Sequence, residues 1–267
     1  MPPDQGVHLT RPDPSETPPI RTVGRPPAGK ATMTVVVGFV ALVACLVVLG
    51  SIADGVRDQE VFALDTWATP FLHGVASHRL DAVMWALTTM GSSLVIVPAF
   101  VIVVGALLIT RRVGAALFLT VASGGALFLN ATMKVLFERP RPHLPWATVL
   151  PDYSFPSGHT MNAFVFYVAL ALIAWSIVGR RLGMPAVAVA VGLAVAVGVS
   201  RIYLGFHYLT DVVGGLLAGT AWLLVVVAAF RARPTWWPWR AATDTAAGGT
   251  GAAGDRGSRG RDAEASR

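Results

Sequence analysis

The chain has 267 residues, of which 54% are hydrophobic and only 13% are charged. Soluble domains carry about 25% charged residues, so this composition excludes a large water-facing surface and is typical of a membrane protein. The formal net charge is +6, but the basic residues lie between long apolar segments, and we expect no nucleic-acid partner. The single cysteine, Cys45, excludes an intramolecular disulfide and a cysteine-based metal site.

Composition divides the chain into three regions. Residues 1–29 are rich in proline, and residues 236–267 are rich in alanine, glycine and arginine, so we expect both tails to be disordered. Residues 30–235 between them are predicted to form one membrane domain.

Six apolar segments occupy this central region: Met33–Ala53, Ser92–Thr110, Val113–Leu136, Thr160–Val178, Met184–Ile202 and Tyr208–Phe230. A helix of about 20 residues crosses the apolar core of a bilayer. Backbone groups in lipid must be satisfied within their own segment, which favours helix. We therefore predict an all-α, polytopic membrane protein with six transmembrane helices. Gly215 and Gly219 predict a close helix contact in the last of them. Residues 56–90 predict either a short surface helix or a simple connecting loop.

The orientation follows from the basic residues that flank alternate segments. They are Arg21, Arg25, Lys30, Arg111, Arg112, Arg180, Arg181, Arg231, Arg233 and Arg240. The positive-inside rule makes their side cytoplasmic, so both termini are predicted to be cytoplasmic in a cell-membrane protein. Loops on the other side break the rule because they hold Lys134, Arg139, Arg141 and Arg201. We expect these loops to form a site on the extracytoplasmic surface.

The segment SRIYLGFHYLTD, residues 200–211, pairs a histidine with a carboxylate. His207 and Asp211 are four residues apart, so on a helix they share one face. The carboxylate can accept a hydrogen bond from one imidazole nitrogen and leave the other nitrogen as a nucleophile or base. An interfacial histidine beside a packing aspartate would give the same pattern. Arg201 offers a planar fork for phosphate oxygens, although it can equally snorkel from a helix end.

The segment FPSGHT, residues 155–160, is typical of a helix start. Ser157 is predicted to be the N-cap, and Gly158 allows close approach of the backbone to a ligand. Free N–H groups at a helix start bind anions. His159 in the first turn could donate a proton, whereas a plain helix start explains Ser157 but not His159.

The segment KVLFERPRP, residues 134–142, places cations beside an apolar helix end. Lys134 lies just inside that end, where a charge is costly and usually functional. Arg141 is held extended between Pro140 and Pro142. Arg139 can be interpreted as an anchor at the outer membrane interface.

Together the three segments resemble the signature of the type 2 phosphatidic acid phosphatase family, which is shared with vanadium haloperoxidases and bacterial acid phosphatases. That signature reads K-x6-RP, then PSGH, then SR-x5-H-x3-D. The matching residues are Lys134, Arg141, Pro142, Pro156, Ser157, Gly158, His159, Ser200, Arg201, His207 and Asp211.

The resemblance implies a membrane enzyme that removes phosphate from a lipid phosphate or diphosphate. His207 would attack phosphorus and form a phosphohistidine, Asp211 would orient His207, and His159 would protonate the leaving oxygen. The phosphoryl oxygens would be held by Lys134, Arg141, Ser157, Gly158 and Arg201. No metal ion or other cofactor is expected, because these cations stabilise the phosphoryl charge.

Three alternatives remain open. The enzyme could pass the phosphoryl group to another lipid or sugar instead of water, since the chemistry is shared up to the phosphohistidine. A transporter or scramblase would need functional polar groups near the midplane of the membrane, whereas these cluster at one surface. A metalloenzyme with His159, His207 and Asp211 as ligands is disfavoured by the surrounding cations. Candidate substrates are undecaprenyl or decaprenyl diphosphate, phosphatidylglycerol phosphate and phosphatidic acid.

Overall fold

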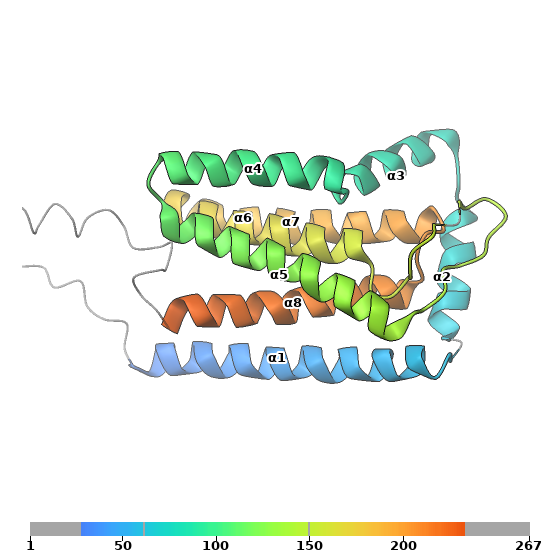
Figure 1. Cartoon of the computed structure of the whole chain (residues 1–267), viewed down its shortest axis with the longest axis horizontal. Coiled ribbons are helices and arrows are strands. Elements are labelled where there is room, and N and C mark those ends of the chain that lie inside the picture. Colours follow the sequence, from blue (N-terminus) through green and yellow to red (C-terminus); the bar gives the residue numbers. More distant parts are fainter. Residues whose placement is uncertain (1–27, 61, 149, 233–267) are drawn as a thin grey trace, which may run out of the picture. The chain divides into compact units, whose positions relative to one another are not determined.

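All regular structure in the described part of the chain is α-helical, as predicted. The computed structural model describes residues 28–60, 62–148 and 150–232, so the predicted disordered tails lie outside the described residues. The helices, drawn in Figure 1, are α1 (Ala28–Arg57), α2 (Ala63–His73), α3 (His78–Met90), α4 (Ser93–Ile109), α5 (Val113–Phe137), α6 (Gly158–Val178), α7 (Arg180–Tyr203) and α8 (Leu209–Ala232). The chain divides into two compact units within α1, after Phe39, and the candidate site lies in the unit that begins at Val40.

The long helices account for the six predicted membrane spans. In the described residues, five of them are long and apolar enough to cross a membrane individually, namely α1, α5, α6, α7 and α8. The sixth span requires α3 and α4 together, which are bent by 42° where they meet. Gly91 lies at this break, and a Cβ atom there would be 2.5 Å from Val197 and 3.1 Å from the carbonyl oxygen of His159. The lack of a side chain therefore lets the break pack against α6 and α7.

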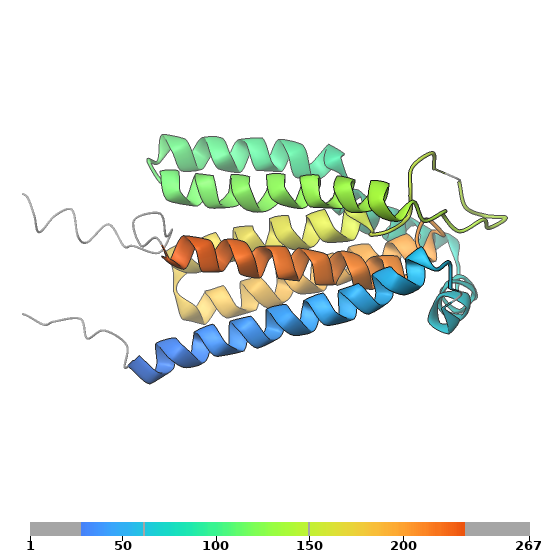
Figure 2. The same cartoon turned by 60° about the horizontal axis from the view of Figure 1, so that its bottom comes forward.

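The segment 56–90 forms two helices, α2 and α3, rather than a simple loop. The α2 helix buries Asp65, Ala68 and Thr69 and packs against α7 and α8. Ser77 caps α3 by accepting a hydrogen bond from the N–H of Leu80 at 3.3 Å. Figures 1 and 2 show α2 at the end of the helices where α5 and α7 finish and α6 and α8 start.

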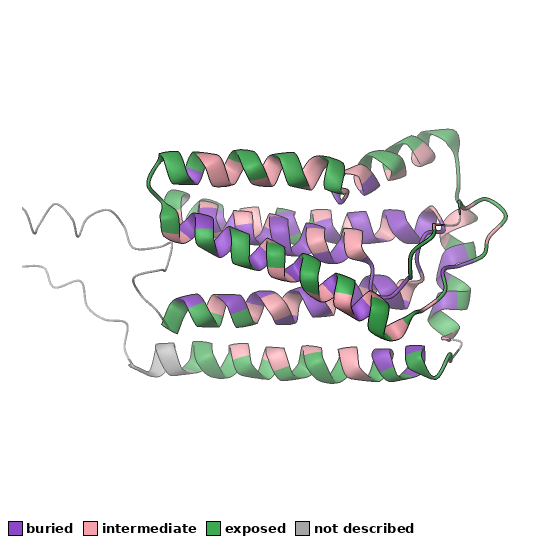
Figure 3. Ribbon diagram, in the orientation of Figure 1, coloured by how far each residue is buried: buried purple, intermediate pink, exposed green. Residues whose placement is uncertain are grey.

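The core lies among α5, α6, α7 and α8. The α6 helix packs against each of the other three, and residues 158–176 are all buried or half-buried (Figure 3). Fully buried side chains of this core include Phe118, Leu119, Met161, Phe166 and Val197. Large apolar side chains that remain exposed on α4, such as Leu94, Ile102 and Ile109, suit contact with lipid tails.

Small residues bring the start of α8 against the start of α6. A Cβ atom at Gly215 would lie 2.8 Å from the carbonyl oxygen of Ser157, and one at Gly219 would lie 3.2 Å from Phe164. The predicted close contact at Gly215 and Gly219 is therefore confirmed. It brings the PSGH segment beside the His207–Asp211 segment.

Candidate active site

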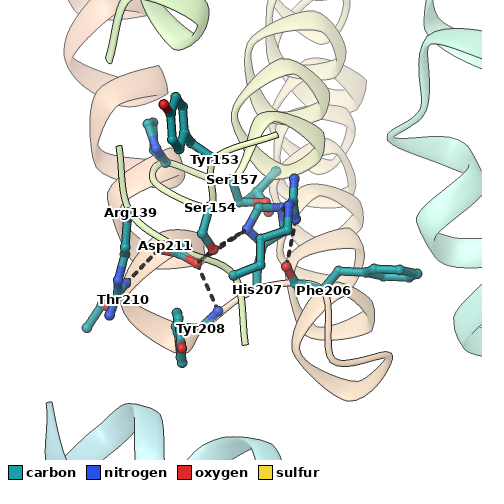
Figure 4. Close-up of polar contacts among 12 residues, drawn as sticks. Arg139, Tyr153, Ser154, Ser157, Phe206, His207, Tyr208, Thr210 and Asp211 are labelled. Atoms are coloured by element: carbon teal, nitrogen blue, oxygen red, sulfur yellow. Dashed lines mark hydrogen bonds and ion pairs between the residues drawn. The ribbon is translucent and has the colours of Figure 1, made fainter. Parts of the chain in front are cut away.

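The His207–Asp211 pair forms as expected, but not on one helix. His207 lies in the turn between α7 and α8, and Asp211 lies in the first turn of α8. The His207 Nδ1 atom is 3.3 Å from Asp211 Oδ2, and both side chains are almost fully buried (Figure 4). The turn, rather than helical spacing, therefore brings the ring to the carboxylate.

The hydrogen-bond partners of His207 define its tautomer. Arg141 Nη1 lies 3.2 Å from His207 Nε2, and a guanidinium can only donate. The Nε2 atom of the neutral ring therefore accepts, and Nδ1 carries the proton that faces Asp211. Burial lowers the pKa of His207 to about 4, although the hydrogen bond and the charge of Asp211 act in the opposite direction. The ring is neutral at pH 7, with the Nε2 lone pair directed to the cationic side of the site.

Asp211 is held by several donors. Its Oδ2 atom accepts hydrogen bonds from the N–H of Tyr208 at 2.9 Å and from the hydroxyl of Ser154. Its Oδ1 atom accepts from Arg139 Nη1 at 2.6 Å. The Ser154 hydroxyl also lies 3.3 Å from His207 Nδ1. A buried carboxylate is costly unless it is paired in this way.

The sequence pattern led to a wrong interpretation of one of these partners, Arg139, and gave no indication of another, Ser154. The interpretation of Arg139 as an interface anchor is wrong, because its largely buried side chain binds the carboxylates of Asp65 and Asp211. Burial alone would lower the pKa of Arg139, but the charges and hydrogen bonds of these two carboxylates raise it. Ser154 was not predicted, since a serine in a loop has no distinctive pattern.

A carboxylate bridges two of the predicted phosphate ligands. Arg141 Nη2 donates to Asp152 Oδ1 at 2.6 Å, and Lys134 Nζ donates to Asp152 Oδ2. Burial alone would raise the pKa of Asp152, but hydrogen bonds and charges from Lys134 and Arg141 lower it to about 2. Asp152 is half exposed, so an anion from solvent can compete for the same two cations. Sequence reasoning did not identify Asp152.

Arg201 approaches the same region from the last turn of α7. Its Nη1 atom donates to Thr88 Oγ1 at 2.9 Å, and its guanidinium lies 4.1 Å from the ring centroid of Phe206. The Nε atom of Arg201 is buried and has no hydrogen-bond partner in the described structure. Its charge acts on both His207 and His159. Arg201 therefore faces the site with donor capacity that is not fully used.

The start of α6 differs in detail from expectation. Ser157 is at the N-cap position, but its hydroxyl makes no capping bond and instead accepts from Thr160 Oγ1 at 2.9 Å. A Cβ atom at Gly158 would lie 2.9 Å from Asn130 Oδ1, so close packing on α5 explains this glycine. His159 is partly buried, and the charges that act on it include those of Arg201, Arg141 and Lys134.

The structure thus gathers the predicted histidines, the aspartate and three cations at one end of α5–α8. Within the described ranges, no group of three or more His, Cys, Asp or Glu side chains is arranged to hold a metal ion. The metalloenzyme alternative therefore has no ligand set in this part of the chain. The cations make the site suitable for an anion, and the His207 ring beside them is neutral.

These features define a class of protein: helical membrane proteins in which a buried His–Asp pair lies beside a cluster of cations. The model of the PAP2 superfamily matches residues 113–235. Phosphatidylglycerophosphatase B of Bacillus subtilis (strain 168) is 34% identical over 143 residues, which cover 52% of this chain and 70% of that protein. A putative undecaprenyl-diphosphatase of Escherichia coli (strain K12) is 37% identical over 106 residues, which cover 38% of this chain and 50% of that protein.

A solved structure of a PAP2 phosphatase has a similar fold. The crystal structure of a transmembrane PAP2 type phosphatidylglycerolphosphate phosphatase from Bacillus subtilis superposes with a TM-score of 0.66 and 26% identity, over 72% of this chain and 96% of that one. The chain belongs to the PAP2 superfamily, and the family resemblance of its three segments is confirmed.

Proposed function

We propose that this protein is a membrane lipid phosphatase that hydrolyses a lipid phosphate or lipid diphosphate through a phosphohistidine at His207. The observation that supports this most directly is the neutral His207 ring, with Nδ1 toward Asp211 and Nε2 toward Arg141. The names of the relatives, a phosphatidylglycerophosphatase and a putative undecaprenyl-diphosphatase, support a lipid-linked phosphate as the substrate.

In the first step, His207 Nε2 attacks phosphorus while the bond from phosphorus to the lipid oxygen breaks. His159 donates a proton to that oxygen, so the lipid leaves as an alcohol or, from a diphosphate, as a monophosphate. The neighbouring cations oppose a positive charge on His159. The negative phosphoryl group of the substrate offsets them and favours the protonated form of His159. Asp211 stabilises the Nδ1–H of His207 as positive charge develops on the ring.

In the second step, water attacks the phosphorus of the phosphohistidine and the bond to Nε2 breaks. His159, now neutral, accepts a proton from the water, and inorganic phosphate leaves. Both steps spread charge over the phosphoryl oxygens, which the cations Lys134, Arg141 and Arg201 would stabilise. The N–H group of Gly158 would add a donor at the start of α6. The N–H group of Ser157 instead donates to the carbonyl oxygen of Asp211 at 3.0 Å.

We also propose that the site faces the extracytoplasmic side and that both termini are cytoplasmic. Arg111 and Arg112 connect α4 to α5 at the end opposite the site, and the positive-inside rule makes that end cytoplasmic. The region 30–235 would then be the catalytic domain.

The test is phosphate release by the purified full chain in detergent. The panel contains phosphatidylglycerophosphate, undecaprenyl diphosphate and phosphatidic acid. We expect the wild-type protein to release inorganic phosphate from at least one of these lipids, even with excess chelator present. The His207→Ala variant should release no phosphate from any of them. Phosphate appearing on an acceptor lipid instead of in solution would favour the phosphotransferase. Activity that needs added Mg²⁺ or Zn²⁺ would contradict the metal-independent mechanism.

A further inference from the structure

A chain of charges links the surface helix α2 to the catalytic carboxylate. Asp65 of α2 is buried, and its Oδ2 atom accepts a hydrogen bond from Arg139 Nη2 at 2.8 Å. Arg139 Nη1 donates to Asp211 Oδ1 at 2.6 Å. The chain of contacts Asp65–Arg139–Asp211–His207 is thus continuous, although its members come from three separate parts of the sequence.

Arg139 has little freedom to move in this arrangement. Its Nη1 atom also donates to Thr210 Oγ1 at 2.7 Å, and its guanidinium lies 4.2 Å from the ring centroid of Tyr208. The ring of Phe62 lies 5.7 Å away. A planar guanidinium with both arms bound and aromatic rings beside it has a defined orientation.

Asp65 also binds the start of α8. Its Oδ1 atom accepts from the N–H of Thr210 at 2.8 Å, and its Oδ2 atom accepts from Thr210 Oγ1 at 2.6 Å. A carboxylate from α2 therefore caps the helix that carries Asp211. The same side chain anchors both Arg139 and the backbone beside the catalytic carboxylate.

The two oxygens of Asp211 have different partners because of this arrangement. Arg139 occupies Oδ1, so Oδ2 is the oxygen that faces Nδ1 of His207. Both Nη atoms of Arg139 are engaged by carboxylates, which distinguishes it from the phosphate-facing Arg141 and Arg201. Arg139 thus acts on the histidine through Asp211 rather than on the phosphoryl group.

We infer that Asp65 and Arg139 are positioning residues, which hold the Asp211 carboxylate in the orientation that keeps the proton of His207 on Nδ1 and leaves Nε2 unprotonated for attack. The inference rests on the proposed function of His207. Small losses of alignment at a nucleophile are costly, because a misplacement of about 1 Å can reduce the rate about 10²-fold.

The kinetic test compares Arg139→Gln, Arg139→Lys and Asp65→Asn with wild type. We expect Arg139→Gln to reduce kcat by about 10²-fold with little change in KM. Arg139→Lys retains the charge without the fork, so it should recover part of kcat. Adding Asp65→Asn to Arg139→Gln should cost little more, because the two residues act as one unit. Matched controls are Arg79→Gln and Asp58→Asn, two exposed residues whose replacement should leave kcat unchanged.

The second readout does not need activity. Nitrogen NMR of protein labelled at the histidine rings reports the tautomer of His207, whose signal is assigned by its loss in His207→Ala. Wild type should show the Nδ1–H tautomer alone at pH 7, and Arg139→Gln should show a mixture. If Arg139→Gln does not fold, Asp65→Asn and Arg139→Lys provide the same comparison.

The outcomes separate the inference from the proposed function. Wild-type phosphate release together with an unchanged kcat and tautomer in the variants would overturn the inference and leave the function intact. No phosphate release by wild type from any lipid of the panel would overturn the function, and the tautomer would then decide the inference. An increased KM with unchanged kcat would identify Arg139 as a substrate ligand, and this result would also overturn the inference.

Discussion

At the scale of single residues, the two histidines of the site differ in what holds them. His207 is buried with Asp211 at its Nδ1 atom, whereas His159 is partly exposed and has no carboxylate among its strongest electrostatic neighbours. His207→Ala should abolish both turnover and phosphoenzyme formation. His159→Ala should slow lipid phosphates by about 10²–10⁴-fold, but should slow an aryl phosphate much less, because that leaving group needs no proton.

The measurement is a comparison of kcat for both substrates, with acid-labile phosphate trapped on the protein and mapped by peptide. Phosphate mapped to His159, or an equal loss on both substrates in both variants, would contradict this assignment of roles.

The pKa of His207 predicts the acid limit of the reaction. Burial lowers this pKa to about 4, and the ring attacks only when neutral. With an aryl phosphate, whose leaving group needs no proton from His159, phosphoenzyme formation should therefore stay constant as the pH falls from 8 toward 5, and should be lost as the pH falls through about 4. Rapid-quench rates, corrected for the ionisation of the substrate, provide the test. A midpoint near the ordinary histidine pKa of about 6.5 would show that burial does not control the nucleophile.

Asp152 binds Lys134 and Arg141, two of the cations proposed to hold the phosphoryl group. Substrate must displace a half-exposed carboxylate from Lys134 and Arg141, and such a pair contributes up to about 1 kcal/mol. Asp152→Asn should therefore lower KM by about fivefold. The inhibition constant of inorganic phosphate should fall in parallel, since product binds the same cations. An increase in both constants would instead mean that Asp152 organises the two cations for binding.

At the scale of the helices, the contact between α6 and α8 brings together the two halves of the site. Gly215 is the closest point, where a Cβ atom would lie 2.8 Å from a backbone oxygen of Ser157. Gly215→Ala should lower stability by about 1–3 kcal/mol by forcing the helices apart. The same shift should reduce kcat, because it moves His159 away from His207.

Thermal unfolding in detergent measures the loss, and Gly124→Ala is the matched control. A Cβ atom at Gly124 meets nothing within 4 Å, so its replacement in the middle of α5 should be neutral or slightly stabilising. Equal melting temperatures for the two variants would argue against a tight α6–α8 contact.

At the scale of the whole molecule, the proposed orientation predicts which loops are accessible from outside the cell. Thr148 lies exposed in the loop between α5 and α6, and Arg112 lies exposed between α4 and α5. In a Cys45→Ser background, Thr148→Cys should react with an impermeant thiol reagent in intact cells, and Arg112→Cys should react only after lysis. The reverse pattern would place the site on the cytoplasmic side.

Much of this architecture is predictable because each long helix must satisfy its own backbone in lipid. That constraint acts along one continuous segment, so apolar runs indicate the spans without any knowledge of packing. Similarly, Lys134, Arg141, His159, Arg201, His207 and Asp211 are recognisable from their spacing. The structure brings those residues to one end of the helices, as the alternating topology requires.

The contacts that complete the site depend on the tertiary structure. Asp65 lies 145 residues before Thr210, and no local pattern distinguishes it from the other acids of its loop. Ser154 and Asp152 are ordinary loop residues until the chain folds back onto His207 and Arg141. The sequence by itself therefore determined the membrane fold and the candidate site residues, because these follow from local hydrophobicity and motif spacing. Only the tertiary structure decided which charges pair in the buried site, because pairing depends on distances between segments that are remote in the chain.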